Sequence, residues 1–189
     1  NEPFTENVLM SAYPRGALGG YLSTYREMAF QGRENATNFE EATANLFSEV
    51  FGFKTEHLGQ LGAKSAPDVL LSSETERYQA IIDNKAYSNY SISGDHHNRM
   101  VHNYLGGIRN YSSNPFPIGF FLYISGGFSN SINSQLYKEH EESGVNGSAI
   151  TVSNLISLVE NHIEKPYSHK ELRDIFGLNR LILLSDILH

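Results

Sequence analysis

The sequence contains no cysteine and no tryptophan in its 189 residues. Without cysteine, disulfides and thiolate metal sites are excluded, a composition that fits a reducing cytoplasm. No apolar run approaches the roughly 18 residues that a membrane-spanning helix needs. The N-terminus also lacks the basic start and apolar core of a signal peptide. Because the first residue is not Met, we expect the chain to be the C-terminal part of a longer protein.

Basic residues are scarce as well: 14 Lys and Arg stand against 21 Asp and Glu, a formal net charge of −7. Non-specific affinity for DNA comes from Lys and Arg that neutralise phosphates, so this chain should bind DNA weakly by itself. Hydrophobic residues make up 40% of the chain, a share that is typical of globular proteins. We expect one domain over residues 1–189, whose first 34 residues follow no clear pattern.

Two short apolar runs carry three charged side chains. Asp68 opens the first run, and Asp83 and Lys85 lie at the end of the second. The polar, turn-like residues 72–77 separate the runs, so the pattern predicts an antiparallel hairpin. Alternate strand residues face the same side. Asp83 and Lys85 should therefore share a face, roughly 7 Å apart along the strand, with Asp68 near them.

Two carboxylates and an amine at one end of a hairpin are typical of metal-dependent phosphodiester hydrolysis. An unpaired charge inside an apolar strand is costly, which favours a functional role for Asp83. Mg²⁺ takes one or two carboxylates together with waters and phosphate oxygens, and it polarises the phosphate. Lys85 would then hold or deprotonate the attacking water. A structural hairpin that carries these residues by chance is the alternative.

Further motifs accompany the hairpin along the chain. They are Val50-Phe51-Gly52-Phe53, His57-Leu58-Gly59, Pro67-Asp68, Asp83-Asn84-Lys85-Ala86-Tyr87-Ser88, Phe121-Leu122-Tyr123-Ile124-Ser125-Gly126 and Glu171-Leu172-Arg173-Asp174-Ile175-Phe176. In this order they resemble the cleavage domain of FokI-like type IIS restriction endonucleases, in the PD-(D/E)xK nuclease superfamily. The likeness runs from about residue 37 to the C-terminus and is most specific at residues 83–88.

The resemblance implies an α/β fold with a restriction-endonuclease-like core, a mixed β-sheet flanked by helices. It implies a Mg²⁺-dependent endonuclease for double-stranded DNA, with Mn²⁺ as a substitute, that leaves a 5′-phosphate and a 3′-hydroxyl. Asp68, Asp83 and Lys85 match the family's catalytic residues. Asp68, Asp83 and the backbone carbonyl of Asn84 would hold the metal. The likeness further implies bacterial restriction–modification and a covalently linked domain that recognises DNA.

A helix from Thr37 to Gly52 is expected upstream of the hairpin. Thr37 followed by Glu40 has the form of a capping box, and apolar residues recur behind it at helical spacing. In the family that the chain resembles, acidic residues of this helix sometimes assist the metal. Glu40 and Glu41 are therefore accessory candidates, although capping explains Glu40 more simply. Lys64, just before the Pro-Asp pair, is an accessory candidate for a phosphate contact.

A second helix is expected over residues 94–111, after the catalytic strand. The resemblance places a dimer surface here, where the family pairs an acid with an arginine. At those positions this chain offers His97 and His102, a departure that would suit another partner or a pH-sensitive contact. One catalytic set cuts one strand, so we expect a transient homodimer on DNA through this helix. A surface helix without a partner is the alternative. The five-residue spacing of the two histidines does not predict a zinc site.

The remaining patterns predict scaffold. Turns at residues 14–20 precede a short helix over residues 21–30. The continuous apolar run 118–125 is typical of a buried central strand. The later elements expected are a strand at 147–152 and helices at 153–163, 168–176 and 178–188.

Two other functions remain open from the sequence. A non-catalytic interaction or dimerisation module would keep the fold without the reaction, and the acidic charge fits it. A repair-type or RNA-directed nuclease would share the chemistry, since the sequence has no signature of base readout or of 2′-hydroxyl recognition.

Overall fold

The computed structural model describes residues 15–59 and 66–188 of the chain. Its centre is a five-stranded sheet in the order β1-β2-β3-β4-β5. The first three strands pair antiparallel and the last three parallel, so the expected mixed sheet is confirmed. The strands are β1 (Lys54–His57), β2 (Val69–Ser73), β3 (Tyr78–Asn84), β4 (Ile118–Ser125) and β5 (Gly147–Thr151).

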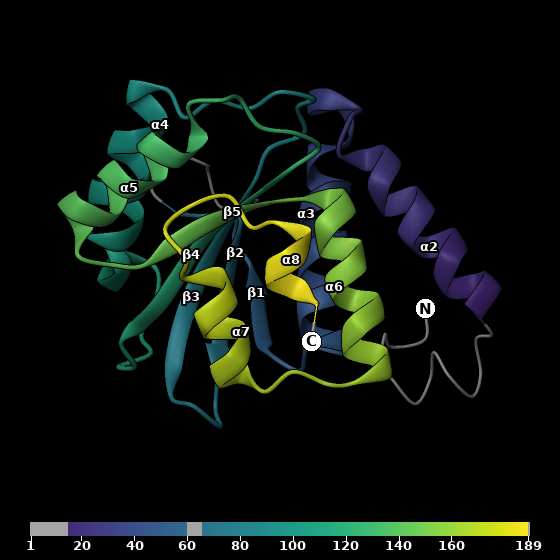
Figure 1. The fold of residues 1–189 in the computed structure, drawn as a ribbon. Helices are drawn as coiled ribbons and strands as arrows, with labels where there is room; N and C mark the ends of the chain where they lie inside the picture. The colour runs from purple at the N-terminus through teal and green to yellow at the C-terminus, as the bar shows by residue number, and fades with distance from the viewer. Residues whose placement is uncertain (1–14, 60–65, 189) are drawn as a thin grey trace.

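Helices cover both faces of this sheet (Figure 1). On one face lie α2 (Arg15–Met28), α3 (Ala36–Asn45), α6 (Val152–Glu164), α7 (His169–Phe176) and α8 (Leu184–Ile187). On the other face lie α4 (Gly94–Asn98), its π-helical continuation η4 (Arg99–Leu105) and α5 (Ile132–Ser143). The short helical segments are η1 (Gly32–Asn35), η2 (Leu46–Val50) and η5 (Ile108–Asn110). No helix of the described ranges is long and apolar enough to cross a bilayer.

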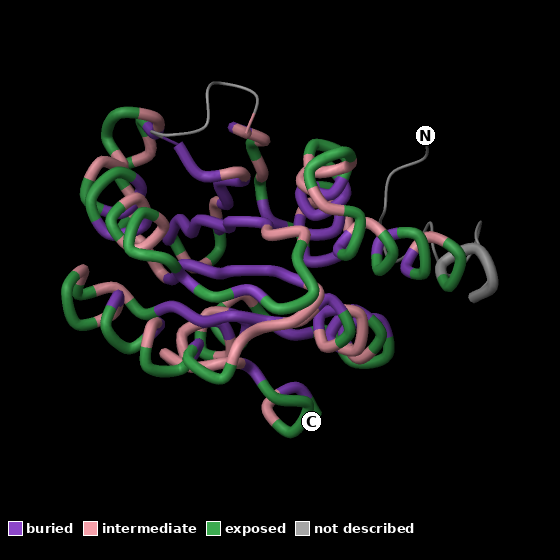
Figure 2. The backbone as a smooth tube through the Cα atoms, turned by 90° about the horizontal axis from the view of Figure 1, so that it is seen from above, coloured by how far each residue is buried: buried purple, intermediate pink, exposed green. Residues whose placement is uncertain are grey.

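The strand pair predicted from the two apolar runs is present as β2 and β3. Val69 pairs with Ile82, and the turn between the strands contains Arg77 in the left-handed region at φ 55°. Side chains alternate between two cores: Ile82 packs on the α3 side, whereas Ile81 packs on the α4 side. Every residue of β3 is buried, as the purple strands in Figure 2 show. This strand therefore brings any charge at its end close to the protein interior.

The predicted central strand is also confirmed. β4 lies between β3 and β5 and is buried along most of its length. Its continuous apolar sequence has a simple cause: in a parallel, centrally placed strand both faces are covered by helices.

Several predictions about local structure were wrong. Helix α2 runs through Gly19 and Gly20, where turns were expected, because Leu22 and Tyr25 anchor its apolar face in the core. Helix α6 is capped by the Thr151 side chain and begins before Ser153.

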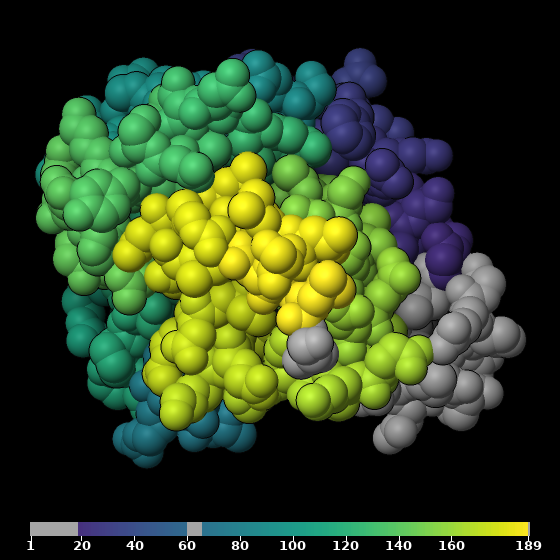
Figure 3. All heavy atoms as spheres, in the orientation of Figure 1, coloured from purple at the N-terminus to yellow at the C-terminus, as the bar shows by residue number. Residues whose placement is uncertain are grey.

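The expected helix over residues 178–188 is limited to α8. The stretch before it runs beside the sheet, where Leu181 bridges Ala149 and Asn179 takes a φ of 59°. The contact with β5 therefore prevents the longer helix that the spacing of the leucines predicts. In the space-filling view, this C-terminal part, drawn in yellow, covers the middle of one face (Figure 3).

Candidate active site

The hairpin brings the two predicted aspartates together. Because Val69 pairs with Ile82 in antiparallel register, the neighbouring Asp68 and Asp83 lie side by side on the face that is covered by α4 and α5. The backbone N–H of Asn84 donates to Asp68 Oδ2 over 2.7 Å, which fixes that carboxylate against the end of β3. The sequence-based expectation that the acids share one face agrees with this geometry.

Lys85 completes the cluster. Its Nζ lies 3.0 Å from Asp83 Oδ2. Asp83 is almost wholly buried, at 5% exposed, while Lys85 and Asp68 are half-buried. The three side chains thus form a compact charged group at the border between the core and the solvent.

Burial and mutual charge set the protonation of this group. Burial raises the pKa of Asp68, and the neighbouring Asp83 carboxylate raises it further. Burial alone would lower the pKa of Lys85, but the charges of Asp83 and Asp68 more than offset it and leave this pKa above the usual value. The lysine is therefore a cation at neutral pH. The site sets this one positive charge against two carboxyl groups.

Such a pair of crowded acids fits a divalent cation. The described residues contain no group of three or more His, Cys, Asp or Glu that could hold a metal. A cation at Asp68 and Asp83 would therefore complete its shell with backbone carbonyl, water or phosphate oxygens, which is the coordination that Mg²⁺ favours. The donor set consists of hard oxygen ligands, so it fits the expected metal.

Asn84 connects the site to the far side of the sheet. Its side chain points away from the acids and donates to Thr43 Oγ1 of α3 over 2.7 Å. The same hydroxyl lies 2.7 Å from the Tyr25 hydroxyl of α2. A buried chain of polar contacts thus runs from Asp68 through the backbone and side chain of Asn84 to the N-terminal helix.

Glu40 lies at the margin of the site, and its predicted role as a helix cap is wrong. Helix α3 begins at Ala36 without a side-chain cap, and Glu40 Oε2 instead pairs with His57 Nε2 at 2.8 Å. The Glu40 charge acts on Asp68 and helps to raise its pKa. Glu41 lies on the exposed side of the helix, and Lys64 lies outside the described residues.

Several further side chains surround the charged group, and the sequence alone does not show how they contact it. Tyr90 is buried with its ring centre 5.7 Å from Lys85 Nζ, and its hydroxyl lies 2.6 Å from His96 Nδ1. Tyr104 and Arg99 of η4 hydrogen-bond to each other and interact electrostatically with the site. Their positions depend on how α4 and η4 pack on the sheet, for which the sequence holds no local signal.

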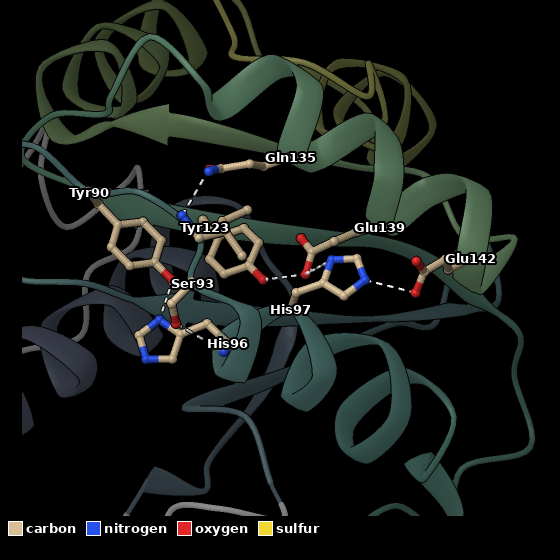
Figure 4. A network of polar contacts seen from close by, with 9 residues as sticks. Tyr90, Ser93, His96, His97, Tyr123, Gln135, Glu139 and Glu142 are labelled. Atoms are coloured by element: carbon tan, nitrogen blue, oxygen red, sulfur yellow. Dashed lines mark hydrogen bonds and ion pairs between the residues drawn. The ribbon is translucent and has the colours of Figure 1, made fainter.

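The helix expected over residues 94–111 forms as α4 followed by η4 and η5. Of the two histidines expected on its outer surface, His102 lies there and His97 does not. His97 turns inward and its Nε2 lies 2.7 Å from Glu142 of α5 (Figure 4). His97 is therefore not available on the outer surface as a dimer contact. The outward side forms a shallow hollow lined by Asp95, Asn98, Arg99, His102 and Asn103.

Comparison with known proteins agrees with this geometry. The family model described as "FokI, cleavage domain" matches residues 1–183. The chain belongs to the FokI cleavage domain family. Its fold is that of the restriction endonuclease FokI, with a TM-score of 0.72 at 23% identity over 84% of this chain. A FokI structure bound to DNA gives a TM-score of 0.72 at 22% identity over 85% of this chain.

Among curated proteins, the type II restriction enzyme StsI of Streptococcus sanguinis is 28% identical in a 149-residue alignment that covers 72% of this chain. The chain spans only 24% of StsI and 30% of each FokI chain. The chain therefore has the nuclease fold of the FokI cleavage domain family and corresponds to one part of those longer proteins.

Proposed function

We propose that this domain hydrolyses phosphodiester bonds of double-stranded DNA in a Mg²⁺-dependent reaction, as the cleavage part of a type IIS restriction endonuclease. The observation that carries the proposal is the cluster of Asp68, Asp83 and Lys85 in a chain of the FokI cleavage domain family. A purely structural hairpin gains nothing from crowding two acids at a buried edge, because each raises the cost of ionising the other.

Asp68, Asp83 and the backbone carbonyl of Asn84 would hold Mg²⁺, with Mn²⁺ as a substitute. When bound, the ion polarises the phosphate and offsets the charge that develops in the transition state. The Asn84 N–H keeps the Asp68 carboxylate oriented, and the Lys85–Asp83 pair keeps the ammonium at the same edge. The substrate phosphate would lie over this edge.

Lys85 would orient the attacking water by donating a hydrogen bond to it and would neutralise phosphate charge. Its raised pKa favours this role over that of a general base. The water oxygen forms a bond to phosphorus while the bond to the 3′ oxygen breaks. One water proton passes to the 3′ oxygen through solvent, so the products are a 5′-phosphate and a 3′-hydroxyl.

A plasmid-nicking assay with and without Mg²⁺ tests the proposal. Asp83→Ala and Lys85→Ala should each lower the rate by roughly 10²–10⁴-fold or more, with unfolding curves close to the wild type. Glu141→Gln, which changes an exposed acid of α5, is the matched control and should cleave normally. Retained cleavage in either site variant would falsify the mechanism. A wild-type chain that never nicks DNA would favour a non-catalytic module.

We also propose that a covalently linked recognition domain supplies most of the DNA affinity, as the net charge of −7 supports. The isolated chain should then bind duplex DNA more weakly than the roughly 10⁻⁴–10⁻⁶ M that is usual for non-specific binding. A filter-binding titration measures this directly. Binding tighter than that range would show that the chain needs no separate source of affinity.

Finally, we propose transient homodimerisation on DNA through α4 and η4. Asp95 and Arg99 lie one turn apart on the outward side, so a two-fold axis would pair each acid with the partner's arginine. Asp95→Arg and Arg99→Asp should each slow double-strand cleavage, and a mixture of the two should restore it. Sedimentation that shows fully active monomers on DNA would exclude the dimer.

A further inference from the structure

An exposed aromatic side chain lies two residues beyond the site lysine. Tyr87 is 45% exposed, and its ring stacks on Tyr90 with the centroids 5.7 Å apart and the planes at 9°. Tyr90 in turn is buried, its hydroxyl is hydrogen-bonded to His96 Nδ1, and its ring centre lies 5.7 Å from Lys85 Nζ. Tyr87 is therefore the solvent end of a stacked column whose inner ring borders the active site.

The backbone around Tyr87 is fixed. Its N–H donates to the Lys85 carbonyl over 2.8 Å, and its own carbonyl accepts from Ser125 Oγ over 2.9 Å. A Cβ atom at Gly126 would lie 2.8 Å from the backbone carbonyl oxygen of Tyr87 and 2.6 Å from the ring of Phe30. The backbone of Tyr87 is therefore packed closely against Gly126, beside the 52% exposed Phe30.

Exposure and rigidity together point to a binding role. A tyrosine held by its backbone and by ring stacking loses little conformational freedom when a ligand covers it. Its ring offers apolar area and its hydroxyl a polar tip, and tyrosine is among the side chains that contact the sugars and phosphates of DNA. The Tyr87 ring centre lies 5.7 Å from the Tyr90 ring centre, which in turn lies 5.7 Å from Lys85 Nζ. A few nucleotides cover such a distance, because each adds about 3.4 Å along a strand.

We propose that Tyr87 is a substrate-contacting residue: its ring lies against a deoxyribose of the strand being cut and its hydroxyl donates to an adjacent phosphate. This inference rests on the proposed DNA cleavage activity. The neutral tyrosine adds contact area where the acidic chain has few cations to offer. Tyr90 and His96 act as positioning residues that hold the ring toward the DNA.

Steady-state cleavage by Tyr87→Ala is the first test. The KM for duplex DNA should rise roughly tenfold with kcat nearly unchanged, because a contact equal in ground state and transition state is lost. Tyr87→Phe, which keeps the ring, should show a smaller rise. The dependence of KM on salt should keep its slope, since no charge is removed. Tyr137→Ala, which changes a tyrosine of α5 that is 54% exposed, is the control and should match the wild type.

The second test needs no cleavage. The chain has no tryptophan, so Tyr87→Trp in an Asp83→Ala background places one fluorophore at the column. Adding a short DNA duplex at low salt should shift its emission to shorter wavelength as the ring loses water. Tyr137→Trp in the same background should not shift.

An unchanged KM in Tyr87→Ala, or an unshifted emission of Tyr87→Trp at saturating DNA, would overturn the inference. So would a loss of activity that disappears at high protein concentration, which would assign Tyr87 to a contact between two copies. If the wild type fails to cleave, the proposed activity fails, whereas the emission titration still decides whether Tyr87 touches DNA.

Discussion

Replacing Glu139 with glutamine should change how the stability of this domain depends on pH. Glu139 lies on α5 and is fully buried, with Oε2 accepting from the Tyr123 hydroxyl over 2.9 Å (Figure 4). Its other oxygen, Oε1, has no hydrogen-bond partner among the described residues. His97 of α4 lies 4.0 Å from Oε2. The carboxyl group is thus buried with one of its oxygens unpaired, an environment that disfavours its charged form.

The expected magnitude follows from the pKa. Burial raises the pKa of Glu139 from 4.5 to about 8; the Tyr123 hydrogen bond opposes this, and the charges of Asp83 and Glu142 add to it. Between these pH values the folded state holds a proton that the unfolded state has lost. The free energy of unfolding therefore falls as pH rises from about 4.5 to about 8 and then levels off. At about 1.4 kcal/mol per pH unit, the loss is at most roughly 5 kcal/mol.

Urea unfolding of wild type and Glu139→Gln at several pH values from 4.5 to 9 measures this difference. The two proteins should be similar near pH 4.5, and the variant should become the more stable one, by as much as a few kcal/mol, near pH 8. Glu142→Gln is the control. Its carboxylate is exposed and the hydrogen bond from His97 lowers its pKa, so it titrates at and below the lower end of this pH range, and the curve of this variant should run nearly parallel to that of the wild type. Parallel curves for wild type and Glu139→Gln would refute the reasoning.

Three further outcomes are expected. Gly52 ends the helical region at a φ of 77°, so Gly52→Ala should destabilise the fold by about 1 kcal/mol in urea unfolding; an unchanged midpoint would contradict the strain at this position. Ser168 and Glu171 form a complete capping box on α7, so Ser168→Ala should cost about 1 kcal/mol, and Ser168→Asp should recover much of it. Mg²⁺ should raise the melting temperature of the wild type, by an amount that corresponds to about 2.7 kcal/mol at a hundredfold excess over Kd, but not that of Asp83→Asn. An equal rise in Asp83→Asn would place the ion elsewhere.

Much of the architecture was predictable because its determinants are local. The hairpin follows from two apolar runs with a polar turn between them, and β4 follows from an uninterrupted apolar run. The capping box at Ser168 lies within four residues of sequence and forms as its pattern predicts. The adjacency of Asp68, Asp83 and Lys85 required only the side-chain alternation of one strand pair.

The errors share a different cause, which is competition from distant partners. Glu40 forgoes the cap of its own helix for His57, 17 residues away. His97 meets Glu142 across 45 residues, which turns it inward and leaves the outer side to Asp95 and Arg99. Helical spacing and local motifs do not predict such contacts, because the contacts form only when helices pack on the folded sheet.

The polar contacts of Asn84 have a practical consequence for the size of a working cleavage unit. The Asn84 side chain donates a hydrogen bond to the Thr43 hydroxyl, and this hydroxyl is also hydrogen-bonded to the Tyr25 hydroxyl. Deleting α2 would remove the Tyr25 hydroxyl from this network and leave Thr43 of α3 without the partner that adjoins it, directly behind the residue between Asp83 and Lys85. A minimal nuclease built from this sequence should therefore start before Arg15, even though every charged group of the proposed chemistry comes much later in the chain.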